Sequence, residues 1–275
     1  MIDKIIDNLS KDDQTLKSCA LTSSSLRPSS QKHLFSLITL DKSLYCDRLL
    51  PLLIENPTLC TYIHEIALMI DQETDPQWLD VNKNLPCVLD MLTLLRSCSL
   101  SIFNEFYWKD IHPQTTAALF RMFALPTLAS ITIIGVYGIP DTFFNIPNVL
   151  EQLELKSVTF TRTSDAGTTS PQSLCMTALD FSPDAKAFVN QDPDTVFAFT
   201  THPDSCFSHI TGLRIHASRE NLPILLPILN AAADSLKFLE LTHPYQEREY
   251  HDGSFFLLNS EKAIKNNQVF HQVGA

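Results

Sequence analysis

A short apolar pattern recurs along this chain and constrains its fold more than any other feature. It consists of an apolar residue, two residues of any type, a second apolar residue, one residue of any type and a third apolar residue. The last two apolar positions of the seven copies are Ile38/Leu40, Ile66/Leu68, Ile131/Ile133, Leu153/Leu155, Leu179/Phe181, Leu213/Ile215 and Leu239/Leu241. Residues two apart in a strand face the same side, so each copy predicts a short strand with one buried face. A weaker copy at Leu100 and Ile102 fills the widest gap.

Stretches with helical spacing of apolar residues separate several of these copies. We predict helices over 86–95, with Asn84 as the cap, and over 115–123 and 221–233. Alternating strands and helices predict an α/β fold with a parallel sheet. The repetition favours an irregular leucine-rich-repeat-like solenoid, with parallel strands on one face and helices on the other.

An ordinary two-layer α/β domain with a parallel sheet is the alternative to the solenoid. Such a sheet would normally place a functional crevice at a glycine-rich turn. The close glycine pair here, Gly135 and Gly138, lacks the third glycine of the dinucleotide-binding fingerprint. We therefore favour the solenoid.

Charge and glycine content argue against two classes of function. The net charge of −11 repels phosphate backbones, so we expect no nucleic-acid partner. Phosphate-binding loops and nucleophile elbows need glycine, because their backbone turns tightly or lies close to a ligand. Only 6 of the 275 residues are glycine, which argues against both kinds of site. We expect no enzyme activity, no catalytic residues and no cofactor. A hydrolase or transferase on an α/β fold is the remaining enzymatic alternative, which a polar pocket beside the sheet would favour.

One polar cluster carries metal-ligand residue types. It comprises His243, Glu247, Glu249, His251 and Asp252. The cluster follows the last repeat copy and has no pair of histidines four residues apart, so we interpret it as a solvated loop and expect no bound metal.

The sequence also predicts where the protein resides. Residues 122–140 carry no charge, but their prolines, glycines and strand-like apolar spacing predict a helical turn followed by a buried strand, and no membrane partner. The N-terminal residues lack the pattern of a signal peptide. Seven cysteines without C-x-x-C spacing are typical of free thiols in a reducing compartment. We expect a cytoplasmic or nuclear protein that is not secreted.

The first forty residues differ from the repeats. Apolar residues at helical spacing predict three short helices, the second opened by a capping box over 10–13. The runs 2–9 and 16–21, together with Pro28 and the segment 33–35, resemble an F-box of the kind common in mushroom-forming fungi. In that family an F-box precedes an irregular leucine-rich array, which is the order seen here.

The resemblance implies a function without chemistry. An F-box docks on a Skp-type adaptor of a cullin–RING ubiquitin ligase, and the repeats hold an unknown protein substrate. The implied adaptor-binding residues are Ile2, Ile5, Ile6, Leu9, Leu16, Leu21, Leu26 and Pro28. The segment departs from the family pattern, since it lacks the Leu-Pro opening and has Leu26 where a Trp is frequent. The alternative is therefore a decayed F-box relative that acts as an interaction module without recruiting a ligase.

The strands supply the candidate partner surface. The middle residue of each apolar-x-apolar triplet faces away from the core, and repeat proteins bind partners along such faces. This sheet face carries Thr39, Ala67, Thr132, Glu154, Asp180, Arg214, His216 and Glu240, a mixed and mostly acidic set. We thus predict three parts: an F-box-like helical segment over 1–40, a repeat array over 41–243, and an atypical tail or improvised cap over 244–275.

Overall fold

The fold was analysed in a computed structural model of the chain. The structure describes residues 2–10, 12–70, 77–161, 174–182, 206–216, 222–242 and 256–257. It divides into two compact units, Met1–Ala129 and Ser130–Ala275, and each is described by itself.

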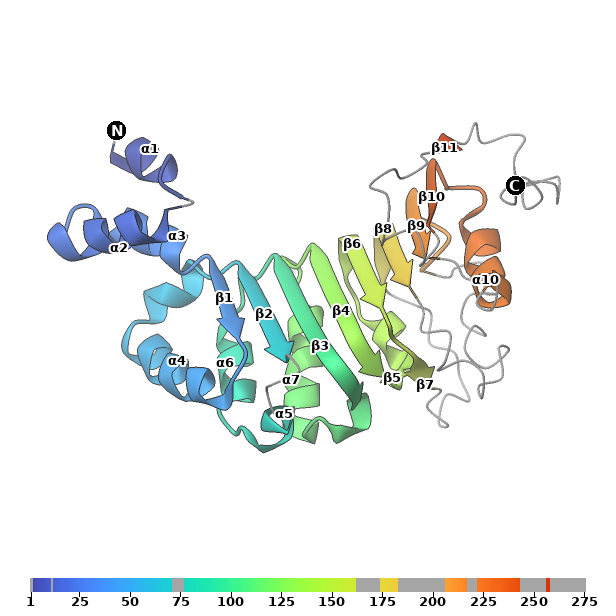
Figure 1. The fold of residues 1–275 in the computed structure, drawn as a ribbon, viewed down its shortest axis with the longest axis horizontal. Helices are drawn as coiled ribbons and strands as arrows, with labels where there is room; N and C mark the ends of the chain where they lie inside the picture. The colour runs from blue at the N-terminus through green and yellow to red at the C-terminus, as the bar shows by residue number, and fades with distance from the viewer. Residues whose placement is uncertain are drawn as a thin grey trace. The chain divides into compact units, whose positions relative to one another are not determined.

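The first unit begins with three helices and continues into three parallel strands with helices between them (Figure 1). Its elements are α1 (Ile2–Asp7), α2 (Asp13–Thr22), α3 (Arg27–Leu34), β1 (Leu37–Leu40), α4 (Ser43–Glu55), η1 (Pro57–Thr61), β2 (Glu65–Ile70), α5 (Trp78–Val81), α6 (Leu85–Met91), β3 (Ser97–Tyr107), η2 (Trp108–Asp110) and α7 (Pro113–Phe123). The strands are ordered β1-β2-β3, and Thr39, Ala67 and Ser99 lie in one row. In the same unit, α4 packs on α6 and α6 on α7.

Three short helices occupy the segment where the sequence predicts them. The cap of α2 differs from the prediction, because Asp12 and not Ser10 is its N-cap. The Asp12 carboxylate accepts hydrogen bonds from the Thr15 backbone N–H at 3.0 Å and the Thr15 hydroxyl at 2.7 Å. The helices pack on one another, and His33 Nε2 lies 2.8 Å from Asp7 Oδ1.

The cap and end of α6 also differ from the sequence prediction. Asn84 is at the N-cap position without a capping side-chain hydrogen bond. The buried Asn82 caps instead, since its Oδ1 accepts from the N–H groups of Asn84 at 2.9 Å and Leu85 at 2.8 Å. Its Nδ2 donates to Ser43 Oγ at 2.6 Å, so one side chain links the starts of α4 and α6. The helix ends at Met91 and not at Leu95.

The second unit carries the remaining strands. Its elements are β4 (Ser130–Tyr137), β5 (Ile139–Pro140), η3 (Asp141–Asn145), β6 (Val149–Lys156), β7 (Phe160–Thr161), β8 (Cys175–Ser182), β9 (Gly212–His216), α10 (Leu222–Ala232), β10 (Phe238–Thr242) and β11 (Phe256–Leu257). The sheet is ordered β4-β6-β8-β9-β10-β11. Its pairs are parallel except that β11 runs antiparallel to β10. A small second sheet pairs β5 with β7 in parallel.

The structure confirms an α/β fold with a mostly parallel sheet. The last two apolar residues of every copy, including the weaker one at Leu100 and Ile102, lie in a strand. Nearly all of these residues, the two that end each copy, are buried. The exceptions are Ile38, Leu239 and Leu241, which are half-buried. Ile38 is on the end strand β1, and the other two are on β10, whose outer neighbour is only two residues long, so fewer side chains cover them.

The uncharged stretch over 122–140 forms the end of α7 and then strand β4, as predicted. Among the helices described here, none is both long and apolar enough to cross a membrane. Of the predicted tail over 244–275, only β11 belongs to the described residues, where Phe238 pairs with Leu257 in the backbone register.

Candidate interaction surface

Strand register brings five of the predicted surface residues into one row of the second unit. Thr132, Glu154, Asp180, Arg214 and Glu240 are aligned on five neighbouring strands, β4, β6, β8, β9 and β10. His216 is two residues beyond Arg214 and pairs in register with Thr242. The other two predicted residues, Thr39 and Ala67, lie in register with each other on β1 and β2 of the first unit.

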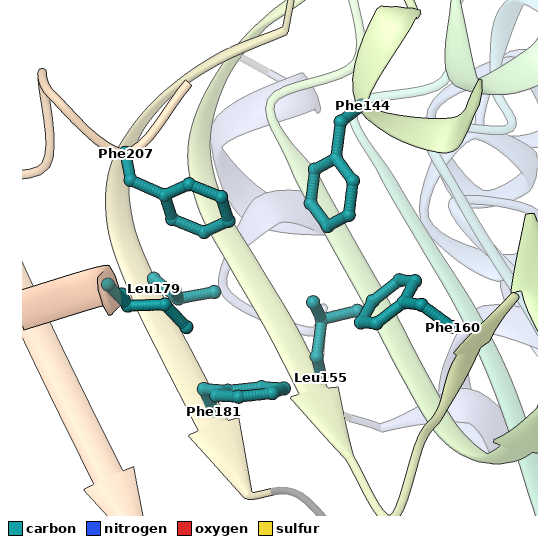
Figure 2. A pocket seen from close by; sticks show the side chains of 7 residues that line it. Phe144, Leu155, Phe160, Leu179, Phe181 and Phe207 are labelled. Atoms are coloured by element: carbon teal, nitrogen blue, oxygen red, sulfur yellow. The ribbon is translucent and has the colours of Figure 1, made fainter. Parts of the chain in front are cut away.

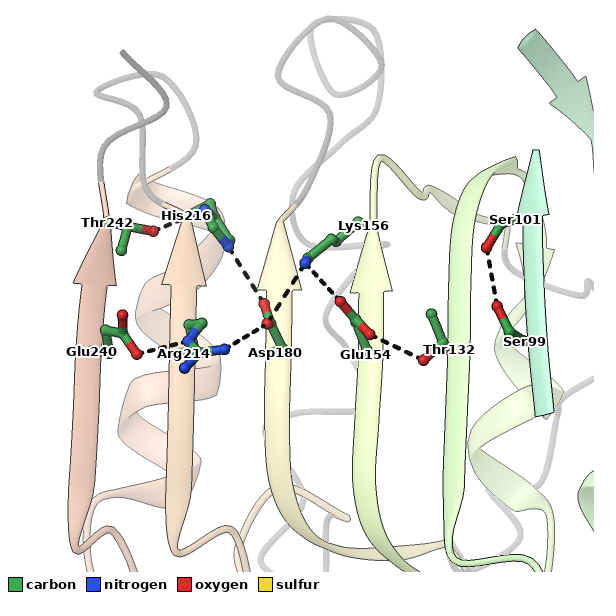
Figure 3. Close-up of polar contacts among 10 residues, drawn as sticks. All are labelled: Ser99, Ser101, Thr132, Glu154, Lys156, Asp180, Arg214, His216, Glu240 and Thr242. Atoms are coloured by element: carbon green, nitrogen blue, oxygen red, sulfur yellow. Dashed lines mark hydrogen bonds and ion pairs between the residues drawn. The ribbon is translucent and has the colours of Figure 1, made fainter. Parts of the chain in front are cut away.

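Ion pairs join the side chains of this row (Figure 3). Glu154 accepts a hydrogen bond from Thr132 Oγ1 at 3.0 Å, and its other oxygen lies 2.6 Å from Lys156 Nζ. Lys156 Nζ is also 3.8 Å from Asp180 Oδ2. The lysine therefore links the carboxylates of β6 and β8.

Arg214 makes the corresponding link between β8 and β10. Its Nε donates to Glu240 Oε2 at 2.6 Å, and its Nη1 lies 3.4 Å from Asp180 Oδ2. His216 Nε2 lies 3.5 Å from the second Asp180 oxygen, and Nδ1 lies 2.8 Å from the Thr242 hydroxyl. Asp180 is thus the centre of the network, with three basic side chains around it.

The acidic and the basic side chains of this row differ in how deeply they are buried. The side chains of Asp180 and Glu240 are only 7% and 9% exposed, whereas those of Lys156 and Arg214 are 35% and 47% exposed. The carboxylates therefore lie close to the sheet, and the cationic groups extend over them toward solvent. The long side chains of Lys and Arg allow this arrangement, since their stems cover the sheet while the charged ends stay wet.

The network alters the protonation of Asp180 and Arg214. Burial alone would raise the pKa of Asp180. The contact with His216 and the charges of Lys156 and Arg214 outweigh that effect and lower its pKa. The hydrogen bond with Glu240 raises the pKa of Arg214. Both shifts favour the charged forms of Asp180 and Arg214.

Lys156 and Thr242 belong to this surface, although sequence reasoning did not select them. The middle residues of the triplets are mixed and mostly acidic, and neither Lys156 nor Thr242 is among them. Lys156 follows Glu154 by two residues and therefore shares its face of the strand. That spacing was sufficient to find Lys156, whereas its pairing with Asp180 on another strand depends on the register.

The opposite face of the second unit's sheet is apolar (Figure 2). A cavity of about 10 Å³ there is lined by Phe144, Leu155, Phe160, Leu179, Phe181, Phe207 and Ile228. This volume is at the lower limit for one water molecule, and a water needs polar partners that the lining lacks. We therefore interpret the cavity as a packing gap in the core and not as a ligand site.

The residues implied in adaptor binding divide by exposure. Ile6 and Leu16 are buried and contribute to the packing of the helices. Leu9 and Leu26 are half-buried. Ile5 and Leu21 are 58% and 83% exposed, and Pro28 is exposed as well. Ile2 is the first residue of α1.

Ionisable side chains elsewhere in the described residues form no further site. Within the described ranges, no three or more His, Cys, Asp and Glu side chains are grouped so that they could hold a metal ion. The cluster from His243 to Asp252 lies outside those ranges. No disulfide forms in the described part of the chain, which includes all seven cysteines. Burial raises the pKa of the Cys46 thiol to about 12.

Comparison of the chain with protein-family models, with curated proteins and with solved structures gave no match.

Proposed function

We propose that this chain is a non-catalytic substrate-recognition subunit of a Skp–cullin–F-box ubiquitin ligase. The observation that carries the proposal is the exposed apolar surface of the N-terminal helices. Ile5 on α1 and Leu21 on α2 are open to solvent while Ile6 and Leu16 pack inward. Large aliphatic side chains that remain exposed on a small packed helical segment are typical of a surface that binds a partner protein. The partner in this proposal is a Skp-type adaptor, and the compartment is cytoplasmic or nuclear.

We propose further that the strands and helices form an irregular leucine-rich-repeat-like solenoid. Strand order supports this interpretation. Within each unit the long strands follow one another in the sheet in the order of the chain. A doubly wound sheet would instead reverse its order at a switch point. In a protein of stacked repeats, each repeat contacts the next one along the chain, so neighbouring strands are parallel and follow the order of the chain.

The substrate surface in this proposal is the sheet face of the array. In the second unit that face carries the row from Thr132 to Glu240, and Arg214 is its most exposed charge. In the first unit it carries Thr39 and Ala67. Fixed charges at defined register suit the selection of one protein partner, since mismatched charges cost binding free energy. Nothing in this role requires a cofactor or a metal.

Substitution of the exposed helix residues tests adaptor binding. The double variant Ile5→Asp/Leu21→Asp places charge where the adaptor would bury apolar surface, so we expect it to abolish co-purification with a Skp-type adaptor. Val149→Asp is the matched control, because Val149 is 73% exposed and lies in the second unit. Helical content by circular dichroism should match wild type in both. Equal adaptor capture by all three proteins, or by none, would contradict the proposal.

A plain interaction module without ligase recruitment is the second candidate. It is favoured by the burial of Ile6 and Leu16, because these apolar positions already serve the packing of the chain's own helices. A folded wild-type protein that never captures an adaptor, yet retains a partner through the sheet face, would favour this alternative.

A further inference from the structure

We propose that the outer face of α4 is an interface at which two copies of this chain associate. Leu44, Tyr45, Leu52 and Ile54 on this helix are all large apolar residues, and each is between 43% and 62% exposed. Leu44 and Leu52 share one face of this thirteen-residue helix and form an apolar patch of the kind that protein contacts cover, with Tyr45 and Ile54 on its two flanks.

The patch is not the side by which α4 packs on its own unit. Cys46, Leu49 and Leu53 are buried and form the inner stripe, through which the helix contacts β1 and α6. Leu44, Arg48, Leu52 and Glu55 follow at spacings of three and four residues and therefore share the opposite, solvent-facing stripe. Because β1 is the end strand of its sheet, α4 lies at the outer end of the first unit (Figure 1).

The charges on this stripe are self-complementary. Arg48 and Glu55 are two helical turns apart, both are exposed, and neither has an ion pair in the part of the chain that the structure describes. An antiparallel approach of two α4 helices about a two-fold axis, centred between Pro51 and Leu52, pairs Arg48 of each copy with Glu55 of the other. A parallel approach in register would place like charges opposite each other. The charge pattern therefore selects an antiparallel, isologous contact.

Helix electrostatics points to the same partner. Glu55 is the last residue of α4, where the helix dipole disfavours a negative charge, and the last turn contains no basic residue. A guanidinium group from a second copy would offset both the carboxylate and the dipole. The central Leu52 residues would meet across the axis and supply apolar burial.

Charge reversal on the full-length chain tests the interface. Wild type should show a concentration-dependent monomer–dimer equilibrium by sedimentation velocity. Arg48→Glu and Glu55→Arg should each raise the dimer dissociation constant by about tenfold or more, since each places like charges in contact twice. The double variant Arg48→Glu/Glu55→Arg restores complementarity and should recover the wild-type constant. Leu52→Asp should abolish the dimer.

These variants lie on an exposed face, and circular dichroism should confirm that each is folded as wild type is. A wild-type chain that stays monomeric at all concentrations would overturn the proposal. The proposal would also be overturned if no variant weakened the dimer, or if the double variant dimerised no more tightly than the two single variants. Either result would place the dimer contact elsewhere on the chain.

Discussion

Asp180 combines low exposure with a charge, which makes it the residue on which the polar face of the second unit depends. Three basic groups, from Lys156, Arg214 and His216, lie within 4 Å of its carboxylate. A buried carboxylate is costly unless such partners compensate it. Its removal also leaves the partners without their shared acceptor. The residue thus joins β6, β8 and β9 by more than backbone hydrogen bonds.

We expect Asp180→Asn to lower the free energy of unfolding at pH 7 by about 1–3 kcal/mol. The loss should depend on pH. The folded pKa of Asp180 lies below its ordinary value of 3.8, so its contribution is fully present above that value and is lost as the pH falls through the folded pKa. Urea titrations from pH 7 to pH 2 should show the two proteins converging in acid. A constant difference between them would contradict the charge network.

Sequence reasoning at this scale found the row but not its pairing. The two-residue period of a strand places Glu154, Asp180 and Arg214 on one face. The aligned copies also give the register, but which charges meet depends on how the long side chains of Lys156 and Arg214 reach across the strands, which the pattern does not contain. The cap of α6 was missed for a similar reason, because Asn82 is fixed by its contact with Ser43, which is distant in sequence.

Strands are the elements that the sequence predicts best here, because each apolar copy carries its own signal. Helix ends were less predictable. The apolar spacing continues to Leu95, but α6 ends at Met91, and Leu92 and Leu95 are buried without being helical. Apolar periodicity reports which residues are buried, and the last turn of a helix is decided by contacts that the sequence pattern does not contain.

Position in the sheet should control the cost of truncating a strand residue. Leu153 on β6 is fully buried, whereas Leu239 on β10 is half-buried. Leu153→Ala should therefore lower the free energy of unfolding by about 2–5 kcal/mol through lost burial and cavity formation. Leu239→Ala is the matched control and should cost roughly half as much or less. Chemical denaturation measures both, and an equal or reversed cost would contradict the assigned sheet positions.

At the scale of the whole molecule, the chain contains a small helical segment, parallel strands with a polar face, and the partly exposed helix α4 of the first unit. The sequence pattern predicts the helical segment followed by the strands, whereas α4 was not among the helices that it predicts. The exposure of Ile5 and Leu21 beside the burial of Ile6 and Leu16 is not predicted by the sequence pattern, because all four residues are aliphatic and lie in short helices. Only the packing of α1, α2 and α3 separates the residues that hold the segment together from those available to a partner.

The central claim is that residues 1–40 dock on a Skp-type adaptor while the array stays open for substrate. Hydrogen exchange of the full-length chain, with and without a saturating adaptor, tests it directly. We predict that backbone amides of α1, α2 and α3 become more protected on addition of the adaptor, whereas those of β6, β8 and β9 exchange at unchanged rates. Unchanged exchange in the three helices, or protection confined to the strands of the second unit, would contradict the claim.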